Sequence, residues 1–237
     1  MSTPLAIVGH GKMGRLVEQL APQHGFHVVA RFTSANIAAL SIETLAGASS
    51  AIEFSTPAAA AGNLCRLASL GIPTVCGTTG WYEHLPQVRQ CVERSGSALL
   101  YGSNFSIGMN LFFQIIANAA SLLSGRPEYE AWGWEIHHSA KKDALSGTLK
   151  KLAEEVRAAG YSRQIALAAN RAGSHPGTHE IGFDSSSDTI TLRHTARNRD
   201  AYAYGALQAV RWLQDKKGLF EFRDILPNLG ATSDKGA

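Results

Sequence analysis

Short apolar runs alternate with helical patterns over the first hundred residues of the chain. The run Leu5–Val8 is apolar at every position, which is typical of a strand buried on both faces of a parallel sheet. Further along, Ser55-Thr56-Pro57 offers hydroxyl groups for a helix cap and a proline for the first helical turn. We therefore predict helices over 13–20, 57–70 and 83–94, between strands at Leu5–Val8, Val28–Phe32, Ala51–Phe54, Thr74–Cys76 and Ala98–Tyr101.

This alternation of strands and helices predicts a Rossmann-like, doubly wound parallel sheet. After Tyr101 the pattern becomes that of an α+β domain, with helices over Leu111–Leu123 and Ser146–Ala159. Longer alternating segments predict a mostly antiparallel sheet from Tyr129–His137, Ile165–Asn170, His179–Asp184 and Thr189–Thr195. Asp200–Lys216 returns to a helix. We therefore predict an α/β protein with a dinucleotide-binding domain over 1–105, joined by 199–237, and a substrate-binding and oligomerisation domain over 106–198.

The composition is that of a globular protein, with 45% hydrophobic and 17% charged residues among 237. The net charge of +3 is too small to indicate nucleic acid, and it favours small anionic ligands. Cys65, Cys76 and Cys91 lack metal-ligand spacing, so we interpret them as buried thiols in a reducing compartment. The N-terminus has no signal-peptide pattern, and the apolar stretch Leu111–Leu123 is too short to cross a bilayer. We expect a cytoplasmic protein without a membrane partner.

A glycine-rich turn joins the first predicted strand to the first predicted helix. Gly9, Gly11 and Gly14 match the G-x-G-x-x-G pattern of dinucleotide-binding folds. The first glycine permits the tight turn, the second lets the backbone approach a pyrophosphate, and the third lets the helix pack closely on the strand. The free N–H groups at the helix start attract phosphate. We expect a dinucleotide to bind at Gly9, His10, Gly11, Lys12 and Met13.

The usual NAD-binding carboxylate is missing after the second predicted strand. An Asp or Glu about 20 residues beyond the glycine turn would bind the ribose 2′-hydroxyl. No acidic residue lies between Glu18 and Glu43, and Arg31 ends the strand instead. A cation at this position suits a 2′-phosphate, although a merely solvated arginine would look the same. The sequence favours NADPH over NADH, with NADH left open.

Two further loops follow predicted strands at the edge where parallel sheets bind ligands. Gly77-Thr78-Thr79 follows Thr74–Cys76, and Gly102-Ser103-Asn104-Phe105 follows Ala98–Tyr101. Small and hydroxylated residues there could hydrogen-bond the nicotinamide and its ribose, whereas each loop alone could be an ordinary capped turn. We expect both loops to contact the cofactor.

The segment from Glu135 to Thr148 combines imidazoles, ammonium groups and a helix start. His137 can carry a proton near neutral pH, and Lys141 is a point-charge partner for a carboxylate. Ser146-Gly147-Thr148 opens a helix whose first N–H groups have no intrahelical partner and can bind an anion. The combination suits a small dicarboxylate substrate that gains a proton as it gains a hydride. Lys142 is interpreted as a solvated surface residue.

No metal site is expected. His137 and His138 are neighbours on a predicted strand, so their side chains point to opposite faces and cannot readily chelate one ion. A third ligand at a recognisable spacing is not apparent in the sequence. The same geometry indicates that the two histidines have different roles.

The motifs taken together resemble the 4-hydroxy-tetrahydrodipicolinate reductase (dihydrodipicolinate reductase) family. The resemblance extends over essentially the whole chain, in order, and its most specific part is the sequence EIHHSAKKDALSGT. The matching segments are Val8–Gly14, Gly77–Gly80, Asn104–Ser106 with Gly108 and Asn110, Glu135–Thr148, Arg171–Gly173, Pro176–His179, Arg199 and Tyr202–Ala206.

The resemblance implies reduction of the cyclic dicarboxylate to tetrahydrodipicolinate by NADPH or NADH, in diaminopimelate and lysine synthesis. It implies that His137 is the proton donor and acceptor, with Lys141 as a second donor candidate. It further implies substrate binding at His138, Gly147 and Thr148, and a homotetramer built through the C-terminal sheet. Leu145 stands where the family typically has proline, and the chain is short around 31–51, which puts the cofactor preference in doubt.

Two other functions remain compatible with parts of the sequence. A different two-domain nicotinamide oxidoreductase acting on a sugar or amino acid would explain the glycine turn but not the dicarboxylate-binding segment. A non-catalytic dinucleotide-binding sensor would not need His137 and Lys141. A substrate screen and a turnover assay would separate these functions from the reductase.

Overall fold

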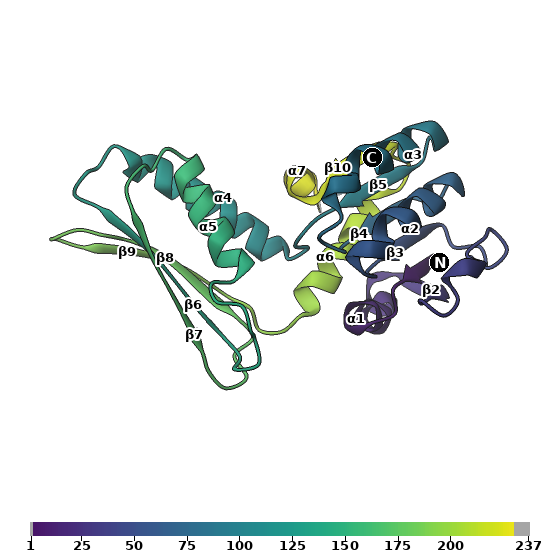
Figure 1. Ribbon diagram of the computed structural model, residues 1–237, viewed down its shortest axis with the longest axis horizontal. Helices are drawn as coiled ribbons and strands as arrows, with labels where there is room; N and C mark the ends of the chain where they lie inside the picture. Colours follow the sequence, from purple (N-terminus) through teal and green to yellow (C-terminus); the bar gives the residue numbers. More distant parts are fainter. Residues whose placement is uncertain (1, 230–237) are drawn as a thin grey trace, which may run out of the picture. The chain divides into compact units, whose positions relative to one another are not determined.

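The computed structural model describes residues 2–229 and divides into two compact units. One unit runs to Ile107 and takes up the chain again from Asp200, and the other comprises Gly108–Arg199. Figure 1 shows the interruption, because the purple and blue N-terminal elements share a unit with the yellow C-terminal ones. The second unit is therefore an insertion into the first.

The first unit contains a six-stranded sheet in which every pairing is parallel. The strand order is β10-β5-β4-β3-β1-β2. The strands are β1 (Thr3–Val8), β2 (Phe26–Phe32), β3 (Ser50–Glu53), β4 (Thr74–Cys76), β5 (Ala98–Tyr101) and β10 (Gly218–Glu221). This confirms the predicted doubly wound sheet, and it adds β10, a four-residue edge strand whose short and only partly buried sequence gave no clear pattern.

Helices cover both faces of this sheet. They are α1 (Lys12–Leu20), α2 (Pro57–Ser69), α3 (Leu85–Ser95), α6 (Asp200–Leu213) and the short α7 (Phe222–Ile225), with single 3₁₀ turns at Ala21–His24, Ile37–Ala39, Tyr82–His84 and Leu226–Asn228. Leu5 and Ile7 of β1 face the core packed with α1 and α6. Ala6 and Val8 face the opposite core. The continuous apolar run in β1 thus reflects burial on both faces, as the sequence predicted.

The second unit contains a four-stranded mixed sheet of order β7-β6-β8-β9. Its strands are β6 (Glu130–His137), β7 (Ile165–Arg171), β8 (Thr178–Asp184) and β9 (Thr189–Thr195). Only β6 and β7 pair in parallel, and the other two pairings are antiparallel, so the predicted mostly antiparallel sheet is confirmed. Helices α4 (Ile107–Ser124) and α5 (Gly147–Ala158) share one apolar core with the sheet.

Helix α4 is long and apolar enough to cross a membrane by length and composition alone. In the structure Met109, Phe112 and Ile116 are buried in the core that α4 shares with α5 and the sheet. Leu111, Ile115 and Leu122 lie on its exposed face. Because the core helix of a soluble domain passes the same test of length and hydropathy, α4 is weak evidence for a membrane span.

The cysteine interpretation was wrong for two of the three residues. Cys65 on α2 and Cys91 on α3 form a disulfide, with 5.2 Å between their Cα atoms. Only Cys76 is a free buried thiol. The two cysteines lie 26 residues apart in the sequence, which does not reveal that their helices pack side by side on one face of the sheet. The argument for a reducing compartment from cysteine usage therefore loses its support.

We expect the disulfide to stabilise the first unit. Closing a loop of 26 residues restricts the unfolded chain and contributes roughly 3.5 kcal/mol in the chain-entropy model. The double variant Cys65→Ser/Cys91→Ser should therefore show a lower free energy of unfolding by denaturant. Dithiothreitol should lower the stability of the parent to that of the variant and leave the variant unchanged. Equal stability of parent and variant under oxidising conditions would contradict the expectation.

Candidate active site

The glycine turn forms a cradle that is open toward solvent. Gly9 has a φ of +92°, and a side chain there or at Gly14 would collide with neighbouring backbone. A Cβ on Gly11 would meet nothing within 4 Å. Gly11 is the N-cap of α1 and provides no side-chain cap, so the first N–H groups of the helix stay available to a ligand. The turn therefore fits the pyrophosphate of a dinucleotide, with Gly9 and Gly14 required by the fold and Gly11 leaving open space for a ligand.

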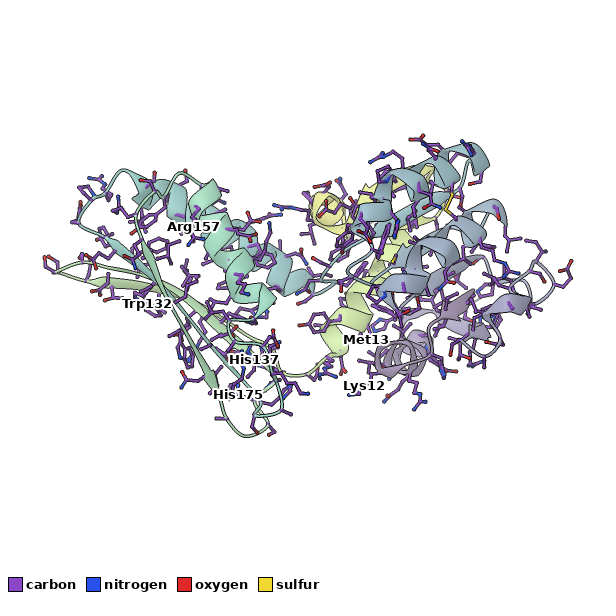
Figure 2. All side chains as sticks on the ribbon, viewed as in Figure 1. Lys12, Met13, Trp132, His137, Arg157 and His175 are labelled. Carbon is purple, nitrogen blue, oxygen red and sulfur yellow. A yellow bond between two sulfur atoms is a disulfide. The ribbon has the colours of Figure 1, made fainter. Side chains whose placement is uncertain are left out.

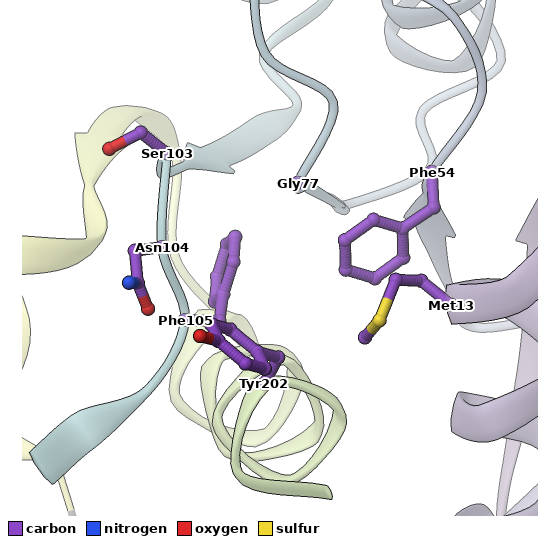
Figure 3. A pocket seen from close by; sticks show the side chains of 7 residues that line it. All are labelled: Met13, Phe54, Gly77, Ser103, Asn104, Phe105 and Tyr202. Atoms are coloured by element: carbon purple, nitrogen blue, oxygen red, sulfur yellow. The ribbon is translucent and has the colours of Figure 1, made fainter. Parts of the chain in front are cut away.

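A pocket opens beside this turn, within the first unit. Figure 3 shows Met13 and Phe54 on one side of the pocket and Asn104, Phe105 and Tyr202 on the other. Gly77 and Ser103 complete its lining. The pocket thus brings together all three loops that the sequence singled out. It also contains Phe54 and Tyr202, which the sequence did not assign to the site.

The loop Gly102–Phe105 is fixed by packing and by a local hydrogen bond. The Phe105 ring is buried and lies 4.6 Å from that of Phe222, centroid to centroid. Asn104 Oδ1 accepts a hydrogen bond of 2.8 Å from the backbone N–H of Ser106. Ser103 is exposed. The loop therefore presents one exposed hydroxyl group on a rigid backbone.

The cation expected at the adenosine end of the site is engaged by a carboxylate. Arg31 donates hydrogen bonds to Glu18 through Nε and Nη2. His10 Nε2 lies 2.6 Å from the other oxygen of Glu18. The hydrogen bonds from Arg31 hold the pKa of Glu18 below its usual range, against the opposing effect of partial burial. A 2′-phosphate that binds Arg31 must therefore compete with Glu18.

In the second unit a buried carboxylate organises the end of the sheet. Glu135 is fully buried on β6, and its Oε1 accepts hydrogen bonds of 2.8 Å from Arg171 Nη2 and 2.9 Å from the backbone N–H of Ser146. Ser146 Oγ donates to Oε2 of the same carboxylate. His179 Nε2 lies 3.4 Å from Oε2, and His137 Nδ1 lies 3.8 Å from it. Figure 2 places His137 at this end of the sheet.

This cluster favours uncharged imidazoles beside an ionised carboxylate. Burial alone would raise the pKa of Glu135, but hydrogen bonds from Ser146 and Arg171 lower it below the usual value. Burial lowers the pKa of His137, and Glu135 offsets this only in part. Burial, and then the neighbouring His137, lower the pKa of His179 to about 4. His137 is therefore an uncharged base near neutral pH in the ligand-free protein.

The lysine and the helix start lie on the loop that follows β6. Lys141 Nζ contacts both carboxylate oxygens of Asp143, at 2.7 and 2.8 Å. Ser146 is the N-cap of α5, and its Oγ accepts a hydrogen bond from the N–H of Leu149. Gly147 is exposed and Thr148 partly exposed, so the first turn of α5 is accessible to an anion. His138 is partly exposed and follows the strand, while His137 points into the cluster.

Sequence reasoning missed Glu135, Arg171 and His179 as parts of the site. Glu135 and His137 lie two positions apart on β6 and therefore share a face. The strand register then pairs His137 with Arg171 on β7 and Glu135 with His179 on β8. Period-two spacing could have identified Glu135 beside His137. The other two residues required the strand pairing, which one sequence does not provide.

Glu135, His137 and His179 also form a group whose ligand atoms lie within 4.8 Å of one another. Glu135 and His179 accompany His137 in space, although their spacing in the sequence does not reveal this. However, the Arg171 guanidinium binds Glu135 directly, and Ser146 fills further acceptor positions of the carboxylate. A divalent cation would have to displace or repel this arginine. The arrangement fits a hydrogen-bonded arginine better than a metal ion.

Comparison with known proteins identifies the family. The family model for the N-terminal part of dihydrodipicolinate reductase matches residues 3–105, and the model for its C-terminal part matches residues 108–226. The chain belongs to the dihydrodipicolinate reductase family. A 4-hydroxy-tetrahydrodipicolinate reductase of Christiangramia forsetii is 32% identical over 95% of this chain and 98% of the relative. One of Rickettsia bellii is 33% identical over 92% of each chain.

Solved structures agree on the fold. Dipicolinate-bound dihydrodipicolinate reductase of a Paenisporosarcina species matches with a TM-score of 0.81 and 22% identity, over 95% of this chain and all of that one. An amine dehydrogenase of Mycobacterium smegmatis, at 10% identity, matches 97% of both chains with a TM-score of 0.62. The two-unit architecture is thus shared with other oxidoreductases. Family membership makes this chain an NAD(P)H-dependent reductase of lysine and diaminopimelate biosynthesis.

The depressed pKa of His179 predicts a pH dependence of stability. The unfolded chain takes up a proton near pH 6.5, whereas folded His179 does so only near pH 4. Its contribution to stability is therefore complete above pH 6.5 and is lost as the pH falls toward 4, by up to roughly 3 kcal/mol. Denaturant unfolding of His179→Gln should show a flatter decline over this range than the parent. The control His27→Gln, at an exposed position, should retain the parent's slope, and an unchanged slope in His179→Gln would contradict this prediction.

Proposed function

We propose that this chain reduces 4-hydroxy-tetrahydrodipicolinate to tetrahydrodipicolinate, with its cofactor in the first unit and its dicarboxylate substrate in the second. The observation that carries the assignment of roles is the cluster of Glu135, His137 and Arg171 beside the open N-terminus of α5. It combines a proton-carrying group with an anion site in one place. Neither alternative function explains this combination, since a sensor needs no proton carrier and a sugar needs no paired anion site.

The substrate's carboxylates bind cationic and N–H groups of the second unit in this proposal. Gly147 and Thr148 at the start of α5 receive one carboxylate, and His138 and Lys141 receive the other. Lys141 must leave Asp143 to do so, and a substrate carboxylate replaces that partner. Lys141 exchanges one carboxylate partner for another, and the exposed Asp143 returns to water, so the electrostatic cost is small.

Proton transfer falls to His137, with Lys141 as the second candidate. The nicotinamide cofactor supplies the hydride. The 4-hydroxyl group of the substrate leaves as water, which gives the conjugated C=C–C=N system. Hydride addition to this system leaves an enamine-like carbon that must be protonated. His137 is uncharged in the free protein because burial lowers its pKa. The arrival of a dianionic substrate favours protonation of the imidazole, which readies it as an acid.

The cofactor binds across the glycine turn and the two loops of the first unit. Gly9 to Met13 contact the pyrophosphate, and Arg31 lies at the adenosine ribose. Gly77–Thr79 and Gly102–Phe105 surround the nicotinamide end, where the pocket of Figure 3 lies. Arg31 supports NADPH, and its pairing with Glu18 leaves NADH usable as well.

We also propose a cytoplasmic homo-oligomer, in which the sheet of the second unit forms the contact. Helices α4 and α5 occupy one face of this sheet. Trp132 and Trp134 alternate with the core residues of β6, so they belong to the other face. Trp132 lies against Gly182, and Trp134 Nε1 donates a 2.7 Å hydrogen bond to Asn170. Ordered tryptophans are typical of protein interfaces. A tetramer follows from the family resemblance.

The proton donor can be tested by His137→Ala. The variant should lose roughly 10²–10⁴-fold in kcat, the usual contribution of general acid–base catalysis. Its Kd for NADPH should stay close to that of the parent, because His137 lies in the other unit. The assay follows NADPH oxidation with freshly generated substrate. A kcat within a few fold of the parent would shift the assignment to Lys141, and absence of turnover in the parent itself would favour the sensor.

The role of Arg31 can be tested by Arg31→Ala with both cofactors. Loss of the guanidinium should raise the KM for NADPH by roughly tenfold, since a charged hydrogen bond to phosphate is worth about 1.5–3 kcal/mol when made. The KM for NADH should change little. The matched variant Glu18→Gln should release Arg31 and lower the KM for NADPH. Equal effects of Arg31→Ala on both cofactors would exclude a 2′-phosphate contact.

A further inference from the structure

A second buried carboxylate lies in the first unit, at the carboxyl end of β3. Glu53 is fully buried and accepts hydrogen bonds from five donors. Oε1 accepts from the N–H and Oγ of Ser55 and, at 3.3 Å, from Asn63 Nδ2. Oε2 accepts from Thr78 Oγ1 at 2.6 Å and from Cys76 Sγ at 3.3 Å. Every partner of this carboxylate can donate a hydrogen bond.

All five donors are uncharged. Within the described residues 2–229, no Lys, Arg or His side chain forms an ion pair with Glu53. A carboxylate removed from water without a counter-ion depends on its hydrogen bonds, so each donor is held firmly in place. The neighbouring Asn63 also donates to Ser55 Oγ at 3.2 Å, which closes the network. Glu53 thus stabilises the particular positions of the segments that carry its donors.

Those segments form the wall of the cofactor pocket. Ser55 lies in the connection from β3 to α2, and Thr78 lies in the loop after β4. Phe54, between Glu53 and Ser55, lines the pocket opposite Phe105 (Figure 3). The Phe54 ring lies so close to Gly77 that a Cβ there would collide with it. The loop Gly77–Gly80 is therefore held by Phe54 through contact and by Glu53 through Thr78.

The network changes the expected role of Thr78. Its side chain is buried, and its hydroxyl donates to Glu53, so it faces away from a ligand. Its carbonyl accepts a 2.8 Å hydrogen bond from Trp81 Nε1. The next residue, Thr79, is exposed. The two threonines thus have different roles: Thr78 holds the loop in place, and Thr79 is exposed to solvent.

We propose that Glu53 is a positioning residue that sets the loops around the nicotinamide by holding Ser55 and Thr78, and that Thr78 acts through Glu53 without binding the cofactor by its hydroxyl. This inference rests on the proposed placement of the cofactor in the first unit. Glu53 thus contributes to the affinity for NADPH and NADH, although it is fully buried and does not touch the cofactor.

The experiment is a double-mutant cycle on cofactor binding. Thr78→Val removes the hydrogen bond between the two side chains, and Glu53→Gln replaces the charged acceptor with an amide that has one acceptor oxygen for the same donors. The Kd for NADPH is measured by fluorescence titration of the substrate-free protein. Each single variant should raise the Kd by about tenfold or more. Because both act through one interaction, the double variant should be no weaker than the weaker single variant. The KM for NADPH should rise together with the Kd in both single variants.

Matched controls come from the opposite end of the same strands. Thr74→Val removes a buried hydroxyl at the start of β4 that donates to the carbonyl of Ile72. Ser50→Ala removes a buried hydroxyl at the start of β3 that has no hydrogen-bond partner among residues 2–229. Both should leave the Kd within about twofold of the parent. A similar loss of affinity in these controls would show a general effect of destabilising the sheet and would overturn the proposal.

Hydrogen exchange of the cofactor-free protein provides a readout independent of binding. Thr78→Val retains the carboxylate and four of its donors, so it tests the network even where Glu53→Gln fails to fold. Exchange should become faster at residues 77–80 and stay unchanged in β1 and β5. Unchanged hydrogen exchange at residues 77–80 would overturn the proposal. So would a double variant whose increase in Kd equals the product of the increases in the two single variants. If the parent bound neither nucleotide, the placement of the cofactor would fail, and exchange alone would still decide the positioning role.

Discussion

The structure of the second unit depends on the buried charge of Glu135. Burying a carboxylate away from water costs free energy unless hydrogen-bond donors fill its acceptor positions. Removing one partner of a buried charged pair destabilises a protein more than replacing the whole pair with apolar residues. Here the partners are Arg171 on β7, Ser146 at the start of α5, and the imidazole of His179 on β8. One carboxylate therefore ties together three elements that are distant in the sequence. The same contacts determine the environment of His137, so the residues that stabilise this end of the sheet also set the protonation of the proposed proton donor.

Glu53 satisfies the same requirement in the first unit by a different means. Its partners are hydroxyl, amide and thiol groups, without the arginine that Glu135 has. The difference agrees with the proposed tasks. The substrate half binds a dianion and benefits from fixed positive charge nearby, whereas the cofactor half needs precisely spaced loops and a neutral surrounding for the nicotinamide. In both units, a buried carboxylate near the end of a rigid strand holds a neighbouring loop in place through hydrogen bonds.

Most of the fold could be predicted from the sequence because its strongest patterns are local. The apolar run of β1, the proline in the first turn of α2 and the alternation in β9 each follow from one short segment. The expected hydroxyl cap of α2 was wrong, because Thr56 makes no side-chain cap hydrogen bond and the Ser55 hydroxyl donates to Glu53 instead. The glycine turn was equally readable, since Gly9 and Gly14 have no room for a side chain and Gly11 leaves the helix start open. The resemblance then supplied the roles of His137 and Lys141, which spacing alone had only suggested.

What the sequence could not provide depends on which segments lie side by side. The disulfide requires that α2 and α3 be neighbours on one face of the sheet, and their cysteines have no telling spacing. Arg171 and His179 join His137 only through the register of three strands. The hydroxyl of Thr78 was expected to face the cofactor, because a short loop pattern does not reveal the buried carboxylate beneath it. Each of these is a contact between positions that are distant in the sequence, and such contacts cannot be recognised from a single sequence.

The insertion of the second unit has a consequence for how the chain is made. Helix α6 and strand β10 complete the first unit, yet they are synthesised after all of Gly108–Arg199. Phe105 meets its partner Phe222 only when the last part of the chain has left the ribosome. Since domains fold as units during synthesis, the inserted unit can reach its native state first, while the cofactor unit waits for its final helix and edge strand. The connectivity of the chain thus determines the order of folding. The second unit can fold before the first unit, although synthesis of the chain starts with the first unit.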